Sequence, residues 1–310
     1  MSLRKHLQPL TTADITTAVF LTLCSLLALL FCSRVPEWYI LILVNSAFIG
    51  VVFYSAHRCM ENRTATPRWI SVVHTWYPIL LILYVYKQTS FLVRPIRQVD
   101  YDQTLIAIDR WIFHLNPTQW IHQFAHPVLT EILQLAYSSY YVLFIVLFFE
   151  LYRRGNRDKL NAGIFLIIYG FFLSYIGYFL VPAVGPRFTL HDFRMNDLEL
   201  PGIWLTPYLR AFINTGGGIP PGASDPLLFV QRDAFPSGHT QLTLVALWIA
   251  FHNKVKSRWY LLGIGSLLIM ATVYMRYHYV IDVLAGVACF FFTIWSGRRI
   301  DAWWRKKTIA

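Results

Sequence analysis

Long apolar stretches dominate the pattern of hydrophobic and polar positions, and polar or basic residues bound each of them. A membrane-spanning helix needs about 20 mostly apolar residues. Eight stretches approach that length, so we expect an all-α protein, a polytopic membrane helix bundle with about eight transmembrane helices. The expected helices cover residues 15–33, 38–56, 68–87, 129–152, 161–181, 239–252, 259–276 and 279–297.

The composition supports lipid as the solvent of this chain. Hydrophobic residues make up 56% and charged residues 14%, whereas soluble domains carry about 25% charged residues. The net charge of +11 comes from short clusters beside apolar stretches, and no basic stripe or motif for nucleic acid occurs. The four cysteines have no metal-ligand spacing. The first stretch lacks a small-residue cleavage site, so we expect a retained helix and not a signal peptide.

The basic clusters alternate along the chain with nearly neutral segments, which predicts an orientation. Because positive residues gather on the cytoplasmic side, we expect both termini there and the segments 88–128 and 182–238 on the other side. That side is periplasmic, extracellular or lumenal, and we expect the membrane to be a bacterial inner membrane. The basic clusters lie at the N-terminus and at 57–68, 153–159, 254–258 and 298–307.

The two long segments differ in character. In 88–128, the apolar residues Leu105, Ile108 and Ile112 recur at helical spacing, which predicts an amphipathic helix in the membrane interface. It either guides lipid towards the protein or packs over the bundle. The segment 182–238 is rich in glycine and proline, and we interpret it as a flexible loop, with a lid as one option.

Three polar fragments carry the chemistry. Between the second and the third the chain crosses the membrane twice, so both return to one face. The first opens the loop that ends at the second, so it shares that face. Fragments far apart in sequence can therefore form one site. They are Pro-Ala-Val-Gly-Pro-Arg at 182–187, Phe-Pro-Ser-Gly-His-Thr at 235–240 and Arg-Tyr-His-Tyr-Val-Ile-Asp at 276–282.

The middle fragment has the features of an anion site. Pro236 suits the first turn of a helix. The amides of Ser237 and Gly238 would then point at the loop side, where a helix N-terminus binds anions. Gly238 lets an anion approach the backbone closely. His239, in that first turn, is placed to exchange a proton with a bound phosphate.

The last fragment pairs a histidine with a carboxylate. His278 and Asp282 are four residues apart and share a helix face, and a carboxylate inside a membrane helix is costly unless it is paired. A hydrogen bond to Asp282 would fix the His278 tautomer and leave its other nitrogen free to attack. Arg187 and Arg276 can bind phosphate oxygens with their planar forks. By contrast, we interpret His74, inside the third expected helix, as structural.

At these residues the sequence resembles the type 2 phosphatidic acid phosphatase superfamily, and most closely the branch that includes inositol phosphorylceramide synthases. The middle motif of the family matches Pro236 to His239, and its last motif, His-x-x-x-Asp, matches His278 and Asp282. The resemblance implies a six-helix catalytic core and a phosphohistidine mechanism without metal or cofactor. The expected organisation is 1–67, two N-terminal helices; 68–297, the core; and 298–310, a basic cytoplasmic tail.

The sequence departs from the phosphatase pattern in two places. Leu180 stands where the first motif has a lysine. Ala271 and Thr272 stand where the last motif has Ser-Arg. Residues 272 and 276 are one helical turn apart, so we expect Arg276 to take over from the absent arginine. The missing lysine and the Gly-Pro-Arg form at 185–187 resemble the transferase branch.

These observations predict an enzyme that uses His278 as nucleophile, His239 as general acid and base, and Asp282 to orient His278. The first hypothesis is a membrane lipid phosphatase that hydrolyses a lipid phosphate or diphosphate. The second is a phosphotransferase, with acceptor contacts from loop 182–238 and from tyrosines 137, 140 and 141, which are more often packing residues. A remote third is a transporter with a zinc site at His278 and Asp282. We expect a lipid phosphate and the bilayer as partners; the lipid and the oligomeric state stay open.

Overall fold

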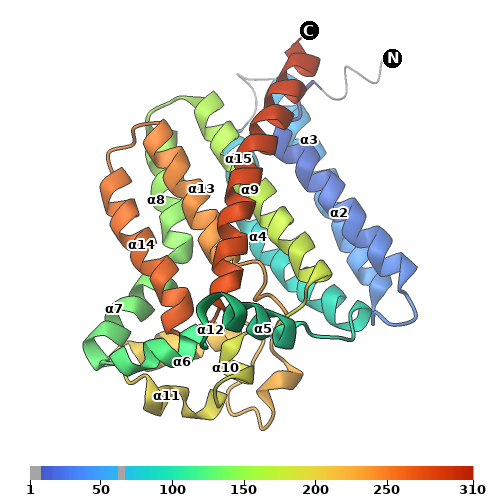
Figure 1. The fold of residues 1–310 in the computed structure, drawn as a ribbon. Coiled ribbons are helices and arrows are strands. Elements are labelled where there is room, and N and C mark those ends of the chain that lie inside the picture. The colour runs from blue at the N-terminus through green and yellow to red at the C-terminus, as the bar shows by residue number, and fades with distance from the viewer. Residues whose placement is uncertain (1–7, 62–66, 310) are drawn as a thin grey trace.

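The fold is a bundle of helices capped at one end by a layer of short helices (Figure 1). The computed structural model describes residues 8–61 and 67–309. These described ranges contain no β-strand, which confirms the all-α bundle. The basic residues predicted at the N-terminus, Arg4 and Lys5, and residues 62–66 of the second basic cluster lie outside the described residues.

The bundle contains a helix for every apolar stretch. Five of its helices, α2, α3, α4, α9 and α15, are long and apolar enough to cross a membrane, which makes the chain a multi-pass membrane protein. The helices α13 and α14 are shorter, at 15 and 17 residues. The bundle helices are α2 (Thr12–Leu30), α3 (Trp38–Glu61), α4 (Arg68–Ile96), α8 (Tyr140–Arg153), α9 (Arg157–Leu180), α13 (Gly238–His252), α14 (Arg258–Tyr274) and α15 (Val280–Ile309).

Helix α9 lies at the centre and is the most buried of the candidate spans. Its glycines 163, 170 and 177 recur every seven residues and lie against α8, α13 and the segment that leads into α13. A Cβ at Gly170 would lie 3.0 Å from Leu242, and one at Gly177 only 2.2 Å from the Pro236 ring. Small residues let membrane helices approach closely. The glycines of α9 thus bring α13 and the Pro-Ser-Gly-His fragment into the middle of the bundle.

The fourth expected helix, 129–152, is not continuous, and this prediction was wrong. It is divided into α7 (Pro127–Ser138) and α8, which meet at an angle of 50°. The hydroxyl of Ser138 donates to the Gln134 carbonyl at 2.8 Å, and that of Ser139 donates to the Ala136 carbonyl at 2.7 Å. Such side chains compete with the helical hydrogen bonds and favour bends.

The expected interfacial helix exists as α5 (Asp102–Phe113), but its buried face differs from the apolar face predicted. Leu105 is buried as predicted, whereas Ile112 is exposed. The buried positions include Asp102 and Asp109. Asp109 accepts hydrogen bonds from the amides of Val280 and Ile281 at the start of α15, at 2.9 and 2.8 Å. The helix therefore packs over the bundle and fixes the beginning of α15.

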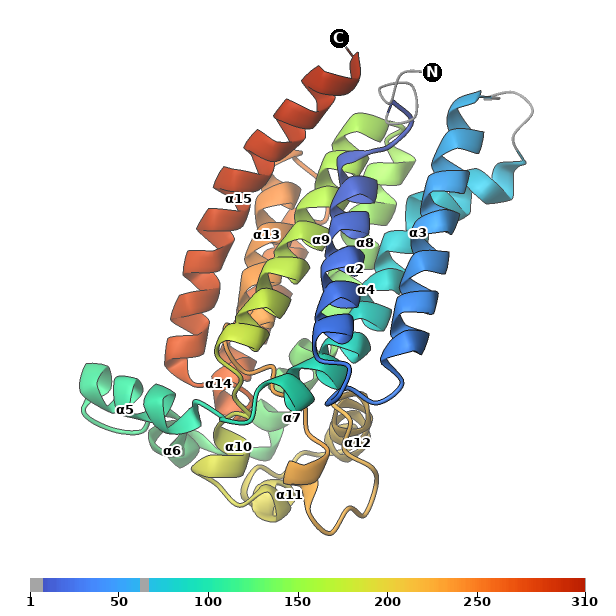
Figure 2. The same cartoon turned by 90° about the vertical axis from the view of Figure 1, so that its right-hand side faces the viewer.

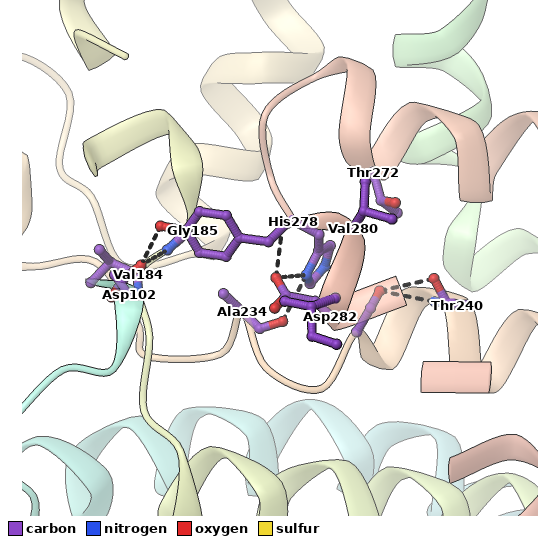
Figure 3. A network of polar contacts seen from close by, with 12 residues as sticks. Asp102, Val184, Gly185, Ala234, Thr240, Thr272, His278, Val280 and Asp282 are labelled. Atoms are coloured by element: carbon purple, nitrogen blue, oxygen red, sulfur yellow. Dashed lines mark hydrogen bonds and ion pairs between the residues drawn. The ribbon is translucent and has the colours of Figure 1, made fainter. Parts of the chain in front are cut away.

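The carboxyl of Asp102 makes the second attachment of α5. It accepts hydrogen bonds from the amides of Val184 and Gly185 at 3.0 and 2.9 Å, and from the Tyr279 hydroxyl at 2.8 Å (Figure 3). Burial raises the pKa of the Asp102 and Asp109 carboxyls above the usual value. The hydrogen bonds that each carboxyl accepts from backbone amides offset part of this rise. One short helix thus holds the first and the last polar fragment in place.

The segment 182–238 contains several short helices and is not an irregular loop, whereas its flexibility and the lid option stay predictions. Its anchor is Glu131 on α7, which accepts hydrogen bonds from the amides of Ile203 and Leu205 at 2.8 and 2.6 Å. The remaining short helices of the capping layer are α6 (Pro117–Ile121), η1 (His122–Phe124), α10 (Pro186–Thr189), η2 (Phe193–Met195), α11 (Asn196–Glu199), α12 (Thr206–Gly216) and η3 (Pro226–Leu228).

The two ends of the described chain lie at the end of the bundle away from the capping layer (Figures 1 and 2). Helix α2 begins at this end, and α15 terminates there at the end of a continuous helix that includes the basic tail. This agrees with termini on one side and the polar fragments on the other. Which side is cytoplasmic stays a prediction.

Candidate active site

The three polar fragments meet beneath α13 and α15, as the count of membrane crossings predicts. Backbone hydrogen bonds join each fragment to another. The Arg187 amide donates to the Arg276 carbonyl at 3.0 Å, and the Ser237 amide donates to the Asp282 carbonyl at 3.0 Å. The amide of Ala234 donates to the Ala183 carbonyl at 3.1 Å. The backbone alone therefore fixes the spacing of the fragments.

His278 is buried, and its ring is held on one side. Its Nδ1 lies 2.7 Å from the Ala234 carbonyl oxygen and 3.5 Å from Asp282 Oδ2 (Figure 3). Both groups are acceptors, so Nδ1 carries the proton and Nε2 keeps its lone pair. The nearer acceptor is the carbonyl and not the predicted carboxylate. Asp282 Oδ2 also accepts from the Tyr279 amide at 2.8 Å.

His239 opens α13 beside His278. The centroids of the two imidazole rings are 5.7 Å apart. The His239 ring stacks on Tyr137 with 4.5 Å between centroids and contacts Tyr140 at 4.3 Å. Two of the three tyrosines treated as packing residues therefore position this histidine, and all three line the cavity that contains it.

Arg187 is the buried cation of the cavity that contains the two histidines. Its Nη1 donates to Asn214 Oδ1 at 2.8 Å, and its guanidinium lies 4.8 Å from the centroid of the Tyr277 ring. Arg187 also lines a neighbouring polar cavity of about 270 Å³ on the side of the capping layer.

The N-terminus of α13 offers fewer donors than predicted. The Ser237 amide is occupied by the Asp282 carbonyl, and the Ser237 hydroxyl accepts from the Thr240 amide at 3.2 Å. The prediction of a free Ser237 amide was therefore wrong. The amides of Gly238 and His239 lie in the first turn, where helical amides have no intrahelical partner. Gly238 also meets a packing need, since a Cβ there would lie 2.7 Å from the Tyr178 hydroxyl.

Arg276 is not brought together with the other predicted residues. It is 1% exposed, its Nη1 donates to Glu199 and Asn196, and its Nη2 lies 3.1 Å from His122 Nδ1. Helix α14 ends at Tyr274, and Arg276 has a φ of 64°. Residues 272 and 276 do not share a helix turn, so the spacing argument for Arg276 fails.

The cavity that contains the histidines has a volume of about 370 Å³. Its wall is mostly aromatic and comes from α4, α7, α8, α9 and α12, while Arg187, Lys87, Asp233 and the two histidines supply its charged and ionisable groups. Apolar walls with a few convergent polar groups are typical of ligand sites. The aromatic and apolar lining residues are Leu83, Tyr86, Tyr137, Tyr140, Tyr141, Phe171, Tyr175, Tyr178, Val184, Phe212, Ile213, Val230, Ala234 and Tyr277.

Two charged residues of this cavity were missed from the sequence. Asp233 accepts a hydrogen bond from the Tyr86 hydroxyl at 2.6 Å, and Lys87 Nζ donates to the Gly216 carbonyl at 2.5 Å. The available signal was Lys87 at the end of an apolar stretch, since charged residues there are costly and often functional. For a metal, no group of three or more His, Cys, Asp or Glu residues lies at ligating distance within 8–61 and 67–309.

The comparisons with known proteins agree with these motifs. A sequence model of the PAP2 superfamily matches residues 103–296, which include all three polar fragments. The chain belongs to the PAP2 superfamily. Members of this superfamily are phosphatases, so membership indicates an enzyme of the phosphatase type. The inositol phosphorylceramide synthase-type branch stays a prediction.

One relative is a PA-phosphatase related-family protein from Dictyostelium discoideum. It is 29% identical over 188 residues, which cover 54% of this chain and 32% of that protein. The chain therefore matches about a third of the relative's length. No solved structure matches the chain significantly.

Proposed function

We propose that this PAP2 superfamily protein is a membrane lipid phosphatase that works through a phosphohistidine at His278. The observation that carries the proposal is the environment of the His278 ring. Its Nδ1 faces the Ala234 carbonyl and Asp282, so Nε2 is the nitrogen available to attack. The carboxylate of Asp282 stabilises the positive ring that forms as the N–P bond is made.

In the first step His278 Nε2 attacks phosphorus in line with the lipid oxygen. Charge on the phosphoryl oxygens is stabilised by the Arg187 guanidinium and by the amides of Gly238 and His239 in the first turn of α13. Phosphoryl transfer depends mainly on such positioning and electrostatic stabilisation. The planar Arg187 side chain is already held by Asn214 and Tyr277, so little of it needs ordering when substrate binds.

His239 handles the proton in both steps. It donates a proton to the departing lipid oxygen, and the P–O bond breaks. It then takes a proton from the attacking water, whose oxygen bonds to phosphorus as the N–P bond to His278 breaks. The contacts with Tyr137 and Tyr140 keep the imidazole beside His278. General acid–base catalysis of this kind typically contributes about 10²- to 10⁴-fold.

The aromatic wall of the cavity favours a lipid substrate. The reactive groups line a largely apolar chamber, which suits a phosphate attached to a hydrocarbon. We propose that this site faces the non-cytoplasmic side, because the basic clusters gather at the opposite end of the bundle.

The test is to trap the covalent intermediate. The purified protein is mixed with a ³²P-labelled phosphatidate in micelles and quenched in base, where phosphohistidine survives and serine phosphate esters break down. Label on the wild type and none on His278→Ala is the expected result. Equal labelling of His278→Ala would overturn the mechanism. His74→Ala is the matched control, and it should label like the wild type.

A second function, phosphotransfer to an alcohol, uses the same residues with a hydroxyl in place of water. The specific observation that favours it is Asp233, a carboxylate inside a cavity that must also accept a phosphate.

A further inference from the structure

We propose that Asp233 binds a hydroxyl group of a polyol, so that the enzyme can pass phosphate to that alcohol as well as to water. This inference rests on the proposed phosphohistidine function and names the acceptor class for it. It concerns a residue that belongs to none of the sequence motifs of the site.

The position of Asp233 follows from its neighbour. Ala234 is the next residue, and its carbonyl accepts the His278 Nδ1 proton at 2.7 Å. Asp233 therefore sits one residue from the group that holds the nucleophile. It lines the same cavity as His278, His239 and Arg187. The backbone that positions the nucleophile consequently also positions this carboxylate.

The chemistry of a carboxylate limits what it can bind. An ionised carboxylate only accepts hydrogen bonds and offers about four lone-pair directions. Within the described residues, the Tyr86 hydroxyl is the single hydrogen-bond donor to Asp233, at 2.6 Å. Asp233 thus has capacity for further donors, and its charge repels phosphate. Its occupant must be a donor group other than the phosphate that binds at Arg187.

Lys87 decides between the two common donor groups, a hydroxyl and an ammonium. It lines the same cavity and is held there by the Gly216 carbonyl at 2.5 Å. A cation held at the cavity disfavours a second one nearby, because like charges repel. A neutral hydroxyl is not repelled by the Lys87 charge. The pair of Lys87 and Asp233 therefore favours a polyol over an amino alcohol.

In the transfer step, the acceptor hydroxyl oxygen attacks the phosphorus of the phosphohistidine, and the bond between phosphorus and His278 Nε2 breaks. The hydroxyl proton passes to His239, which gave its own proton to the first leaving group. The product is a phosphate ester of the alcohol. Asp233 holds a second hydroxyl of the same alcohol molecule. This raises the effective concentration of the attacking hydroxyl relative to water.

The experiment measures how phosphate is divided between alcohol and water. The full-length protein in detergent micelles receives ³²P-labelled phosphatidate with either glycerol or 1-propanol, and the phosphate ester and inorganic phosphate are quantified. Asp233→Asn is the test variant. Asp225→Asn, an exposed carboxylate outside the cavity, is the control. A loss of one hydrogen bond to a charged group corresponds to about tenfold.

The expected result is a ratio of glycerol phosphate to inorganic phosphate that falls about tenfold in Asp233→Asn. The 1-propanol ratio should stay within about twofold, and Asp225→Asn should match the wild type. A merely structural role would lower the total rate and leave the ratio unchanged, and that outcome overturns the inference. Release of phosphate that depends on His278, without transfer to glycerol, also overturns it but leaves the proposed phosphatase intact. Turnover that is independent of His278 overturns both.

Discussion

Two histidine–aspartate pairs with buried carboxylates stand at opposite ends of the helix bundle. At one end His278 Nδ1 lies 3.5 Å from Asp282 Oδ2, and at the other His74 Nε2 lies 3.3 Å from Asp14 Oδ2. Both carboxylates are buried in the first turn of a helix. By distance and burial the pairs are nearly alike, so what surrounds them must account for any difference in function.

The pair at the N-terminal end is used to build structure. Asp14 accepts hydrogen bonds from the Thr11 amide at 2.7 Å, the Thr11 hydroxyl at 2.8 Å and the Tyr77 hydroxyl at 2.7 Å. It forms the capping box of α2. Its cavity has arginines, but Arg153 and Arg157 are exposed. The carboxylate oxygens of Asp14 therefore accept their hydrogen bonds from the start of α2 and from α4.

The pair in the candidate site stands beside groups whose chemistry suits phosphate. His278 has a second histidine, His239, with a ring centroid 5.7 Å away, and shares a cavity with the buried Arg187. The first turn of α13 adds backbone donors. A histidine–aspartate pair is therefore a weak signal by itself. The convergence of a second base, a cation and a helix N-terminus distinguishes the candidate site.

The largest expected effect separates the two histidines. His278→Ala should lower phosphate release by at least about a thousandfold, because the nucleophile is lost. His74→Ala should stay within about twofold. Initial rates on a phosphatidate in micelles provide the measurement, with circular dichroism to check folding. Comparable losses in both variants would mean that the two ends are functionally equivalent, against our interpretation.

The second prediction concerns His239, which the other end lacks. His239→Gln should lower kcat about 10²- to 10⁴-fold, since proton transfer to the leaving oxygen is lost. With an aryl phosphate, whose leaving group needs no proton, the rate of the first step should fall much less in this variant. Burst kinetics with the aryl substrate check this. An equal loss for both substrates would argue against a role for His239 as general acid.

The third prediction contrasts a buried arginine with an exposed one. Arg187→Gln should reduce kcat/KM about a hundredfold, because one stabilising cation at the phosphoryl oxygens is removed. Arg153→Gln, in the cavity of the other pair, should have almost no effect. Inhibition by vanadate, which resembles the transition state, should weaken in parallel for Arg187→Gln. Unchanged vanadate inhibition would separate Arg187 from the phosphate site.

The fourth prediction follows from the 2.7 Å contact between His278 and the Ala234 carbonyl. Because this carbonyl already holds the Nδ1 proton, Asp282→Asn should cost about ten- to a hundredfold in kcat, less than the loss of His278 itself. Single-turnover phosphorylation of the variant gives the relevant rate. A loss as complete as that of His278→Ala would show that the carboxylate, and not the carbonyl, orients the ring.

The smallest effect on activity is expected at Asp14. Asp14→Asn weakens the capping box and the Tyr77 hydrogen bond, at a cost of about 1–2 kcal/mol. The thermal unfolding midpoint should fall by about 2–6 °C, with kcat unchanged at 25 °C. Fluorescence-monitored unfolding and an activity assay on the same sample test both parts. Reduced kcat with an unchanged midpoint would assign Asp14 to function.

The location of the site could be predicted from the sequence, whereas the roles of Arg276 and Ser237 could not. The count of membrane crossings correctly brought the three polar fragments to one end, because each long apolar stretch must leave the membrane at a defined side. The role of Arg276 depended on a helix turn that does not exist, since α14 ends at Tyr274. The Ser237 amide was assigned to phosphate, but the carbonyl of Asp282, remote in sequence, takes it.

Lipid solvation explains what the sequence determined by itself. A stretch of about 20 apolar residues leaves the backbone little choice but a helix, so the approximate positions of most helices and a shared end of the bundle for His239 and His278 can be read in advance. The pairing of His278 with Asp282 is likewise local, four residues apart on one helix.

Contacts between residues far apart in the chain were decided only by the tertiary structure. Asp102 and Asp109 look like solvent-exposed residues of an amphipathic helix, yet they bind the backbone of two remote fragments. Tyr86 and Asp233 meet across 147 positions. A hydrogen bond of this kind depends on where two independent elements come to rest, and neither element's own periodicity contains that information. The sequence thus pointed to His278 as the candidate nucleophile, while the packing of remote segments determined which groups surround it.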